Sequence, residues 1–178
     1  MRATLDLDLL LPQHWTRLLA ALCCALAMPA ALAIDAGQTA PEFTLASAEG
    51  QPLQLAAFRG KLVYLDFWAS WCAPCRRSFP WMNAMQEKYG PAGLVVLGVN
   101  LDQRRPDAER FLAQVPAKFA IAYDPQGAAP KLYAVKGMPS SVLIDREGRV
   151  LLVHAGFRDE ERDELEATIR AALPARAN

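Results

Sequence analysis

The apolar residues of the chain fall into short continuous runs and into stripes with a helical period. The runs at 61–69 and 94–99 are almost entirely apolar, which is typical of strands buried on both faces. Shorter runs predict further strands at 43–45, 52–55, 121–123, 141–144 and 149–154. The last two runs flank the turn residues 145–148, so they predict an antiparallel hairpin.

The helical stripes lie between these runs. Residues 73–89 repeat apolar side chains every three or four positions, which predicts a helix. Residues 106–114 begin with a proline and two nearby acids, as helix starts do, and 159–173 combines an acidic first turn with an apolar stripe. Residues 125–133 predict a short helix or turn. The order ββ-β-α-β-α-β-α-β-β-α predicts an α/β domain, a mixed sheet with helices on both faces.

Residues 1–33 differ from the rest of the chain. An uncharged run at 18–33 follows Arg17 and ends in Ala31-Leu32-Ala33, the pattern of a secretory signal peptide cleaved after Ala33. The alternative is an uncleaved membrane anchor, since the run is only slightly shorter than a spanning helix. Pro29 favours the signal peptide because it breaks a helix near the cleavage site. The expected domains are therefore 1–33, a signal peptide or anchor, and 34–178, an exported domain.

Composition narrows the function of that domain. The chain is 53% hydrophobic, which is ample for a packed core and argues against disorder. Lys+Arg and Asp+Glu each total 19, and this balance argues against a nucleic-acid-binding protein. No run reaches 18 consecutive apolar residues, so the sequence does not predict a multi-span membrane protein.

Cleavage after Ala33 would leave two cysteines, Cys72 and Cys75. A disulfide across so short a span closes almost no loop and adds little stability, so the pair predicts chemistry instead. Half of a zinc site is the alternative, but zinc takes about four ligands and residues 34–178 add only His154. We therefore expect neither a metal nor a cofactor.

Two motifs carry a resemblance to a known family. Residues 66–75, Asp-Phe-Trp-Ala-Ser-Trp-Cys-Ala-Pro-Cys, resemble the active-site strand, turn and helix start of thioredoxin-fold oxidoreductases. Residues 137–141, Gly-Met-Pro-Ser-Ser, resemble the cis-proline loop of that fold. The two lead-in strands, the helix after Asn100 and the export signal are similar to the TlpA/ResA-like periplasmic thiol–disulfide oxidoreductases. The resemblance covers about 38–173 and implies a thioredoxin-like fold with an N-terminal β-hairpin extension and a central inserted helix.

Catalytic roles for Cys72, Cys75 and Asp66 follow from this resemblance. At a strand-to-helix junction Cys72 meets free N–H groups, so we expect the pKa of its thiol to lie below the ordinary value of about 8.5. Cys75, one turn into the helix, would resolve the mixed disulfide. An inward-facing Asp66 would be a buried carboxylate of raised pKa that exchanges the Cys75 proton. The alternative is an aspartate that faces solvent at a strand edge.

Substrate contacts are expected from Trp71, Ala73, Pro74, Met138 and Pro139. A cis Pro139 would pack against the cysteine pair, while Met138 offers backbone groups to an extended substrate; an ordinary trans turn is the alternative. Many relatives carry Thr or Ile before this proline and Thr after it, so Met138 and Ser140 depart from the family pattern. That departure bears on the identity of the partner protein and does not affect the predicted fold.

One further acid stays unresolved by the sequence. Proteins of the TlpA/ResA type often carry a carboxylate in the loop after the next strand, here residues 100–103. Gln103 falls at that acid's position and Asp102 lies beside it. Whether Asp102 or Gln103 contributes to the site remains open at this point.

The resemblance implies a dithiol reductant of disulfides in exported proteins, such as apocytochrome c or a copper-site assembly protein. Its electrons would come from a membrane thiol protein. The Trp-Cys-Ala-Pro-Cys motif resembles reducing thioredoxins more than the oxidising branch, so an oxidant is the alternative within this enzyme class. Outside it, the alternative is a binding or chaperone module for a partner protein or metal, without redox turnover.

Overall fold

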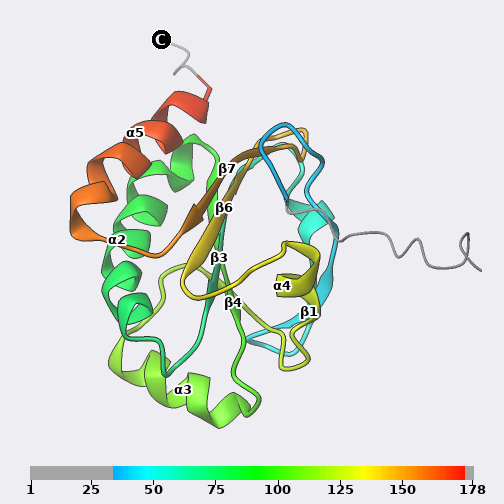
Figure 1. Ribbon diagram of the computed structural model, residues 1–178, viewed down its shortest axis with the longest axis vertical. Coiled ribbons are helices and arrows are strands. Elements are labelled where there is room, and N and C mark those ends of the chain that lie inside the picture. The colour runs from blue at the N-terminus through cyan, green and yellow to red at the C-terminus, as the bar shows by residue number, and fades with distance from the viewer. Residues whose placement is uncertain (1–33, 175–178) are drawn as a thin grey trace, which may run out of the picture. The chain divides into compact units, whose positions relative to one another are not determined.

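Seven strands form one mixed sheet in the computed structural model, which describes residues 34–174 (Figure 1). Across the sheet the order is β2-β1-β5-β4-β3-β6-β7. Strand β3 lies near the middle, parallel to β4 and antiparallel to β6. The strands are β1 (Thr44–Ser47), β2 (Pro52–Gln54), β3 (Leu62–Trp68), β4 (Leu94–Asn100), β5 (Ala120–Tyr123), β6 (Ser140–Ile144) and β7 (Val150–Ala155).

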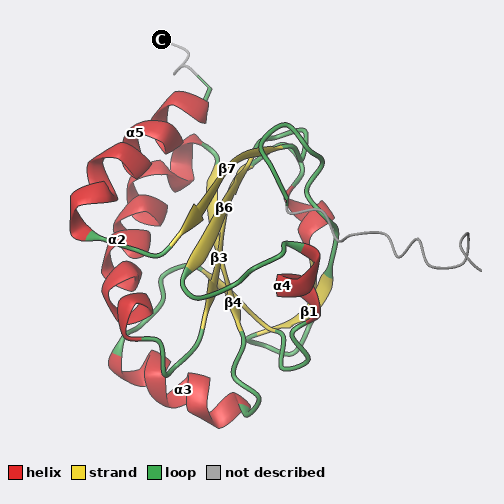
Figure 2. Cartoon of the chain, in the orientation of Figure 1, coloured by secondary structure: helices red, strands yellow, loops and turns green. Residues whose placement is uncertain are grey.

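Helices cover both faces of the sheet (Figure 2). Helices α2 and α5 lie along one face, and the short α4 lies on the other (Figure 1). The helices are α2 (Ala73–Tyr89), α3 (Arg105–Gln114), α4 (Ala128–Leu132) and α5 (Arg162–Ala172), with 3₁₀ turns η1 (Leu55–Phe58), η2 (Gly90–Ala92) and η3 (Asp159–Glu161). This architecture confirms the predicted mixed sheet with helices on both faces.

Strand β3 separates two apolar cores, and every one of its residues is buried. Tyr64 and Trp68 belong to the core shared with α2, α3 and α5, whereas Leu65 and Phe67 belong to the core beneath α4 and η1. Side chains alternate between the faces of a strand, so Asp66 projects into the α2 side with Tyr64 and Trp68. The carboxyl group of Asp66 is thereby placed inside the apolar core on the α2 side of the sheet.

Most elements differ from the expected boundaries by one to three residues, and the differences at the second strand and the last helix have a clear physical cause. The strand predicted at 52–55 ends at Gln54, because the chain turns into η1 and buries the Leu55 side chain. The helix predicted at 159–173 begins with the 3₁₀ turn η3 and ends at Ala172. Leu173 leaves the helix because the residue before Pro174 disfavours helical dihedrals. The lead-in hairpin also pairs with β5, so it extends the main sheet.

The signal peptide and anchor predictions fall on residues 1–33, outside the described part of the chain. Between residues 34 and 174, none of the helices combines the length and the apolar character that crossing a membrane requires.

Candidate active site

The disulfide between Cys72 and Cys75 lies at the N-terminus of α2, with 5.3 Å between the two Cα atoms. Cys72 caps the helix, and its Sγ accepts a hydrogen bond from the Cys75 backbone N–H at 3.2 Å. Pro74 occupies the first turn, where the missing N–H costs no helical bond. The helix N-terminus favours negative charge, so a thiolate at Cys72 is stabilised here.

The two sulfur positions differ in access. Cys75 is fully buried and Cys72 is 4% exposed, while the neighbouring Trp71 side chain is 72% exposed. Ala73 is also exposed and Pro74 is half-buried. Cys72 is therefore the outer sulfur, and Cys75 is the inner one.

The loop before β6 contributes the second part of the site. The Met138–Pro139 peptide bond is cis. Pro139 is buried, and Met138 packs against the core cluster that contains both cysteines. The Pro139 carbonyl accepts a hydrogen bond from Gly156 N–H at 2.8 Å, and Ser140 Oγ donates to the Gly137 carbonyl at 2.7 Å. The first bond joins the loop to the end of β7, and the second lies within the loop.

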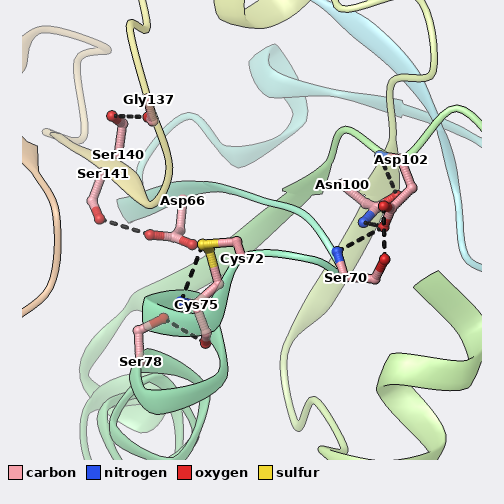
Figure 3. The surroundings of a disulfide bond; sticks show 10 residues. All are labelled: Asp66, Ser70, Cys72, Cys75, Ser78, Asn100, Asp102, Gly137, Ser140 and Ser141. Atoms are coloured by element: carbon pink, nitrogen blue, oxygen red, sulfur yellow. Dashed lines mark hydrogen bonds between the residues drawn. A yellow bond between two sulfur atoms is a disulfide. The ribbon is translucent and has the colours of Figure 1, made fainter. Parts of the chain in front are cut away.

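Asp66 is buried, with 1% of its surface exposed, and Figure 3 shows its carboxyl group pointing toward the sulfur atoms. Ser141 Oγ donates to Asp66 Oδ1 at 2.7 Å, and the Tyr64 hydroxyl donates to Ser141 Oγ at 2.9 Å. Asp66 Oδ2 is buried without a hydrogen-bond partner in the described part of the chain. Burial raises the pKa of Asp66 from its ordinary value of 3.8 to about 7, and the Ser141 hydrogen bond opposes that rise. Such a carboxyl group can accept or release a proton near neutral pH.

A second buried carboxylate, Asp102, is hydrogen-bonded to Ser70 in the turn before α2 (Figure 3). Its Oδ2 accepts from the Ser70 backbone N–H at 2.9 Å and from Asn100 Nδ2 at 2.7 Å. Its Oδ1 accepts from Ser70 Oγ at 2.8 Å. Gln103 is exposed and lies outside this network. Of the two candidates that the sequence left open, Asp102 is the one joined to the active-site turn.

An aromatic cluster supports α2 behind the disulfide. Trp68 is fully buried, and its ring centroid lies 4.9 Å from those of Phe79 and Phe111. Arg76 places its guanidinium over the Phe111 ring at 5.0 Å. The described residues 34–174 bring together no group of three or more His, Cys, Asp or Glu side chains that could hold a metal ion.

Tyr64 and Ser141 are two residues of the site to which the sequence analysis gave no role. Both are buried polar side chains, and β6 pairs with β3 so that Ser141 lies opposite Asp66. The spacing of Tyr64 two residues before Asp66 is a usable signal, since it places both side chains on one face of a strand. The pairing partner of Asp66 depends on register, which the sequence does not reveal.

The chain is similar in sequence and in structure to known thiol–disulfide proteins. A family model described as Redoxin matches residues 35–169. The thiol–disulfide oxidoreductase ResA of Bacillus thuringiensis is 33% identical over 79% of this chain and 80% of its own length. ResA of Geobacillus thermodenitrificans is 36% identical over 72% of this chain and 74% of its own. A crystal structure from Chlorobium tepidum, assigned as the thiol:disulfide interchange protein DsbE, is similar with a TM-score of 0.78 and 56% identity, covering 80% of this chain and 100% of that one.

Proposed function

The chain belongs to the Redoxin family and is a thiol–disulfide oxidoreductase of the ResA/DsbE type, and we propose that it reduces disulfides in exported proteins of the periplasm. An enzyme of this class acts on a disulfide-containing substrate. The signal-like run at 18–33 supports export, and the Trp-Cys-Ala-Pro-Cys motif supports the reducing direction.

In the first chemical step the Cys72 thiolate attacks a substrate disulfide. A Cys72–substrate disulfide forms, and one substrate sulfur leaves as a thiolate that takes up a proton from water. The position of Cys72 at the start of α2 stabilises its thiolate, and its place as the outer sulfur suits it to attack.

In the second step Cys75 resolves this mixed disulfide. Its S–H bond breaks, the proton passes to the Asp66 carboxylate, and the Cys75 thiolate attacks the Cys72 sulfur. The second substrate thiolate leaves and takes up a proton. Two electrons have then moved from the cysteine pair to the substrate, and the protein holds the Cys72–Cys75 disulfide seen in the structure.

The substrate is held by the exposed rim of the disulfide. Trp71 and Ala73 supply exposed surface beside Cys72, and Pro74 lies next to them. Across the disulfide, Met138 offers backbone groups to an extended substrate segment, as in strand addition, and Pro139 packs beside the cysteine pair. The substrates of the protein are exported proteins of the apocytochrome c or copper-site assembly type. A membrane thiol protein returns the Cys72–Cys75 pair to the dithiol state.

The observation that carries this proposal is the buried Asp66 carboxyl group directed at a disulfide on a helix N-terminus. The test is the reduction potential of the Cys72–Cys75 pair, measured by equilibrating the purified protein against glutathione and dithiothreitol. We expect a value near that of thioredoxin, about −270 mV, which suits a reductant. A value near about −120 mV would make the protein a disulfide donor and overturn the reducing direction. A pair that forms no reversible disulfide would leave the binding module as the better account.

A further inference from the structure

Three buried side chains form a chain of hydrogen bonds that ends at the carboxyl group of Asp66. Tyr64 and Asp66 lie on the same face of β3, and Ser141 lies opposite Asp66 on β6. The Tyr64 hydroxyl donates to Ser141 Oγ at 2.9 Å, and Ser141 Oγ donates to Asp66 Oδ1 at 2.7 Å. All three residues are at most 3% exposed, so water does not compete freely for these bonds.

The direction of these bonds follows from counting hydrogens. Each hydroxyl carries one hydrogen, so Ser141 gives its hydrogen to Asp66 while it accepts the hydrogen of Tyr64. If the order were reversed, the Tyr64 hydrogen would be buried without an acceptor, which folded proteins avoid. Asp66 Oδ1 is therefore an acceptor in both protonation states of the carboxyl group.

For the proton of a neutral Asp66 carboxyl group, only the second oxygen, Oδ2, is then left. Asp66 Oδ2 is buried, has no hydrogen-bond partner in the described residues, and lies on the side of the disulfide (Figure 3). We infer that Ser141, held by Tyr64, is a positioning residue that confines the exchangeable proton of Asp66 to Oδ2, facing the cysteine pair. This inference rests on the proposed role of Asp66 in taking the Cys75 proton.

The position of this proton sets the direction of proton transfer from Cys75 in the second step. The Cys75 S–H bond breaks as an O–H bond forms at Asp66 Oδ2, and the electron pair left on sulfur attacks Cys72. The pair of electrons from the broken Cys72–substrate bond leaves with the substrate thiolate. Without Ser141 the carboxyl group could rotate or carry its proton on Oδ1, away from the sulfur.

The other groups around Asp66 offer little electrostatic compensation. On β4 the position opposite Asp66 is Gly98, which has no side chain. On β7 His154 lies opposite Ser141, and its Nε2 is 3.3 Å from Glu161 Oε2 on η3. Burial and the Ser141 hydrogen bond are the two influences on the Asp66 pKa, and they act in opposite directions. Removal of the Ser141 hydroxyl leaves burial alone, so the pKa rises further.

The test measures how the rate of the second step, the attack of Cys75 on the mixed disulfide, depends on pH. The reduced full chain reacts with the aromatic disulfide DTNB, and the second aromatic thiolate released reports attack by Cys75. In Ser141→Ala we expect the acid limb of this rate profile to move up by about one pH unit, since a hydrogen bond to the carboxylate is lost. Tyr64→Phe should shift the limb by less than one pH unit, because Ser141 Oγ still donates to Asp66. Ser141→Thr retains a hydroxyl group, so we expect its pH–rate profile to match that of the unmodified protein.

Three controls separate the possible outcomes. In an Asp66→Asn background, Ser141→Ala should add no shift, because its effect passes through Asp66. His154→Gln, on the same row of the sheet, should leave the limb in place. A limb unmoved in Ser141→Ala, a shift that persists without Asp66, or an equal shift in His154→Gln overturns the inference. An Asp66→Asn profile identical to that of the unmodified protein overturns the proposed role of Asp66 itself. If Ser141→Ala does not fold, Tyr64→Phe decides, and an unshifted limb there counts against the inference.

Discussion

Two buried aspartates flank the active-site turn, and the structure treats them in opposite ways. Asp102, 6% exposed, accepts three hydrogen bonds through both carboxylate oxygens, from Ser70 and Asn100. Asp66, 1% exposed, accepts one, from Ser141, and its Oδ2 has no partner in the described residues. A carboxylate whose oxygens are all bonded holds structure in place, whereas one with a free buried oxygen is left able to take a proton.

The difference has an energetic side. A buried charge is costly unless hydrogen bonds or an opposite charge compensate it. Asp102 has that compensation, including a backbone N–H that the turn would otherwise leave unbonded. Asp66 has little of it, so burial raises its pKa to about 7. The charge of Asp66 destabilises the fold, and the same property fits it for proton transfer.

The largest expected effect is on the pH dependence of stability. The folded protein keeps the Asp66 proton up to about pH 7, while the unfolded chain releases it near the ordinary value of 3.8. Unfolding therefore releases a proton within this window, and the free energy of unfolding falls as pH rises, by about 4 kcal/mol in all. Denaturant unfolding of the oxidised protein between pH 4 and 8 measures this fall. In Asp66→Asn the contribution should vanish, so the variant should exceed the parent in stability at pH 8.

The next effect is kinetic. Asp66→Asn removes the proposed base for Cys75, so we expect the second thiolate released from DTNB to appear about 10²-fold more slowly, with the first release little changed. Asp102→Asn is the matched control, with the same substitution at the other buried carboxylate. Equal slowing in both variants would show that Asp66 acts through the shape of the site and not through its proton.

A smaller effect of opposite sign is expected for the stability of Asp102→Asn. The variant keeps an oxygen for the Ser70 backbone N–H and for Asn100 Nδ2, and its NH₂ group can donate to Ser70 Oγ, but the negative charge that strengthens all three hydrogen bonds is lost. We expect the free energy of unfolding at pH 8 to fall by about 2 kcal/mol. Denaturant unfolding measures it alongside Asp66→Asn. A gain in stability in both variants would erase the distinction between the two aspartates.

Much of the fold followed from the sequence because its signals are local. The run at 61–69 and the stripe at 73–89 correspond to β3 and α2, and their junction places the cysteine pair. Short elements were less accurate: Leu55 reads as the end of a strand, yet the chain turns there to bury its side chain. No local pattern distinguishes these outcomes, since the deciding contact lies elsewhere in the chain.

The residues of the site also divide into those that local sequence signals predict and those that depend on distant contacts. Cys72, Cys75 and Asp66 lie within ten residues, so motif and alternation were enough to bring them together. Ser141 reaches Asp66 through the β3–β6 register, and Asp102 reaches Ser70 across the end of β4. Both pairings join segments more than 30 residues apart, and the sequence alone left the part played by Asp102 open.

The smallest expected effect tests how Asp102 holds the turn. Ser70→Ala removes the hydrogen bond from Ser70 Oγ to Asp102 Oδ1 and leaves the bonds to Oδ2 from the Ser70 backbone and Asn100 in place. We expect a loss of about 1 kcal/mol in the free energy of unfolding, the typical contribution of one such bond. The rate of the second DTNB step and its pH profile should match those of the unmodified protein, because Oδ1 of Asp102 is remote from the proton on Asp66. A shifted profile in Ser70→Ala would mean that the two aspartates are coupled through the turn, and the separation of their roles would then fail.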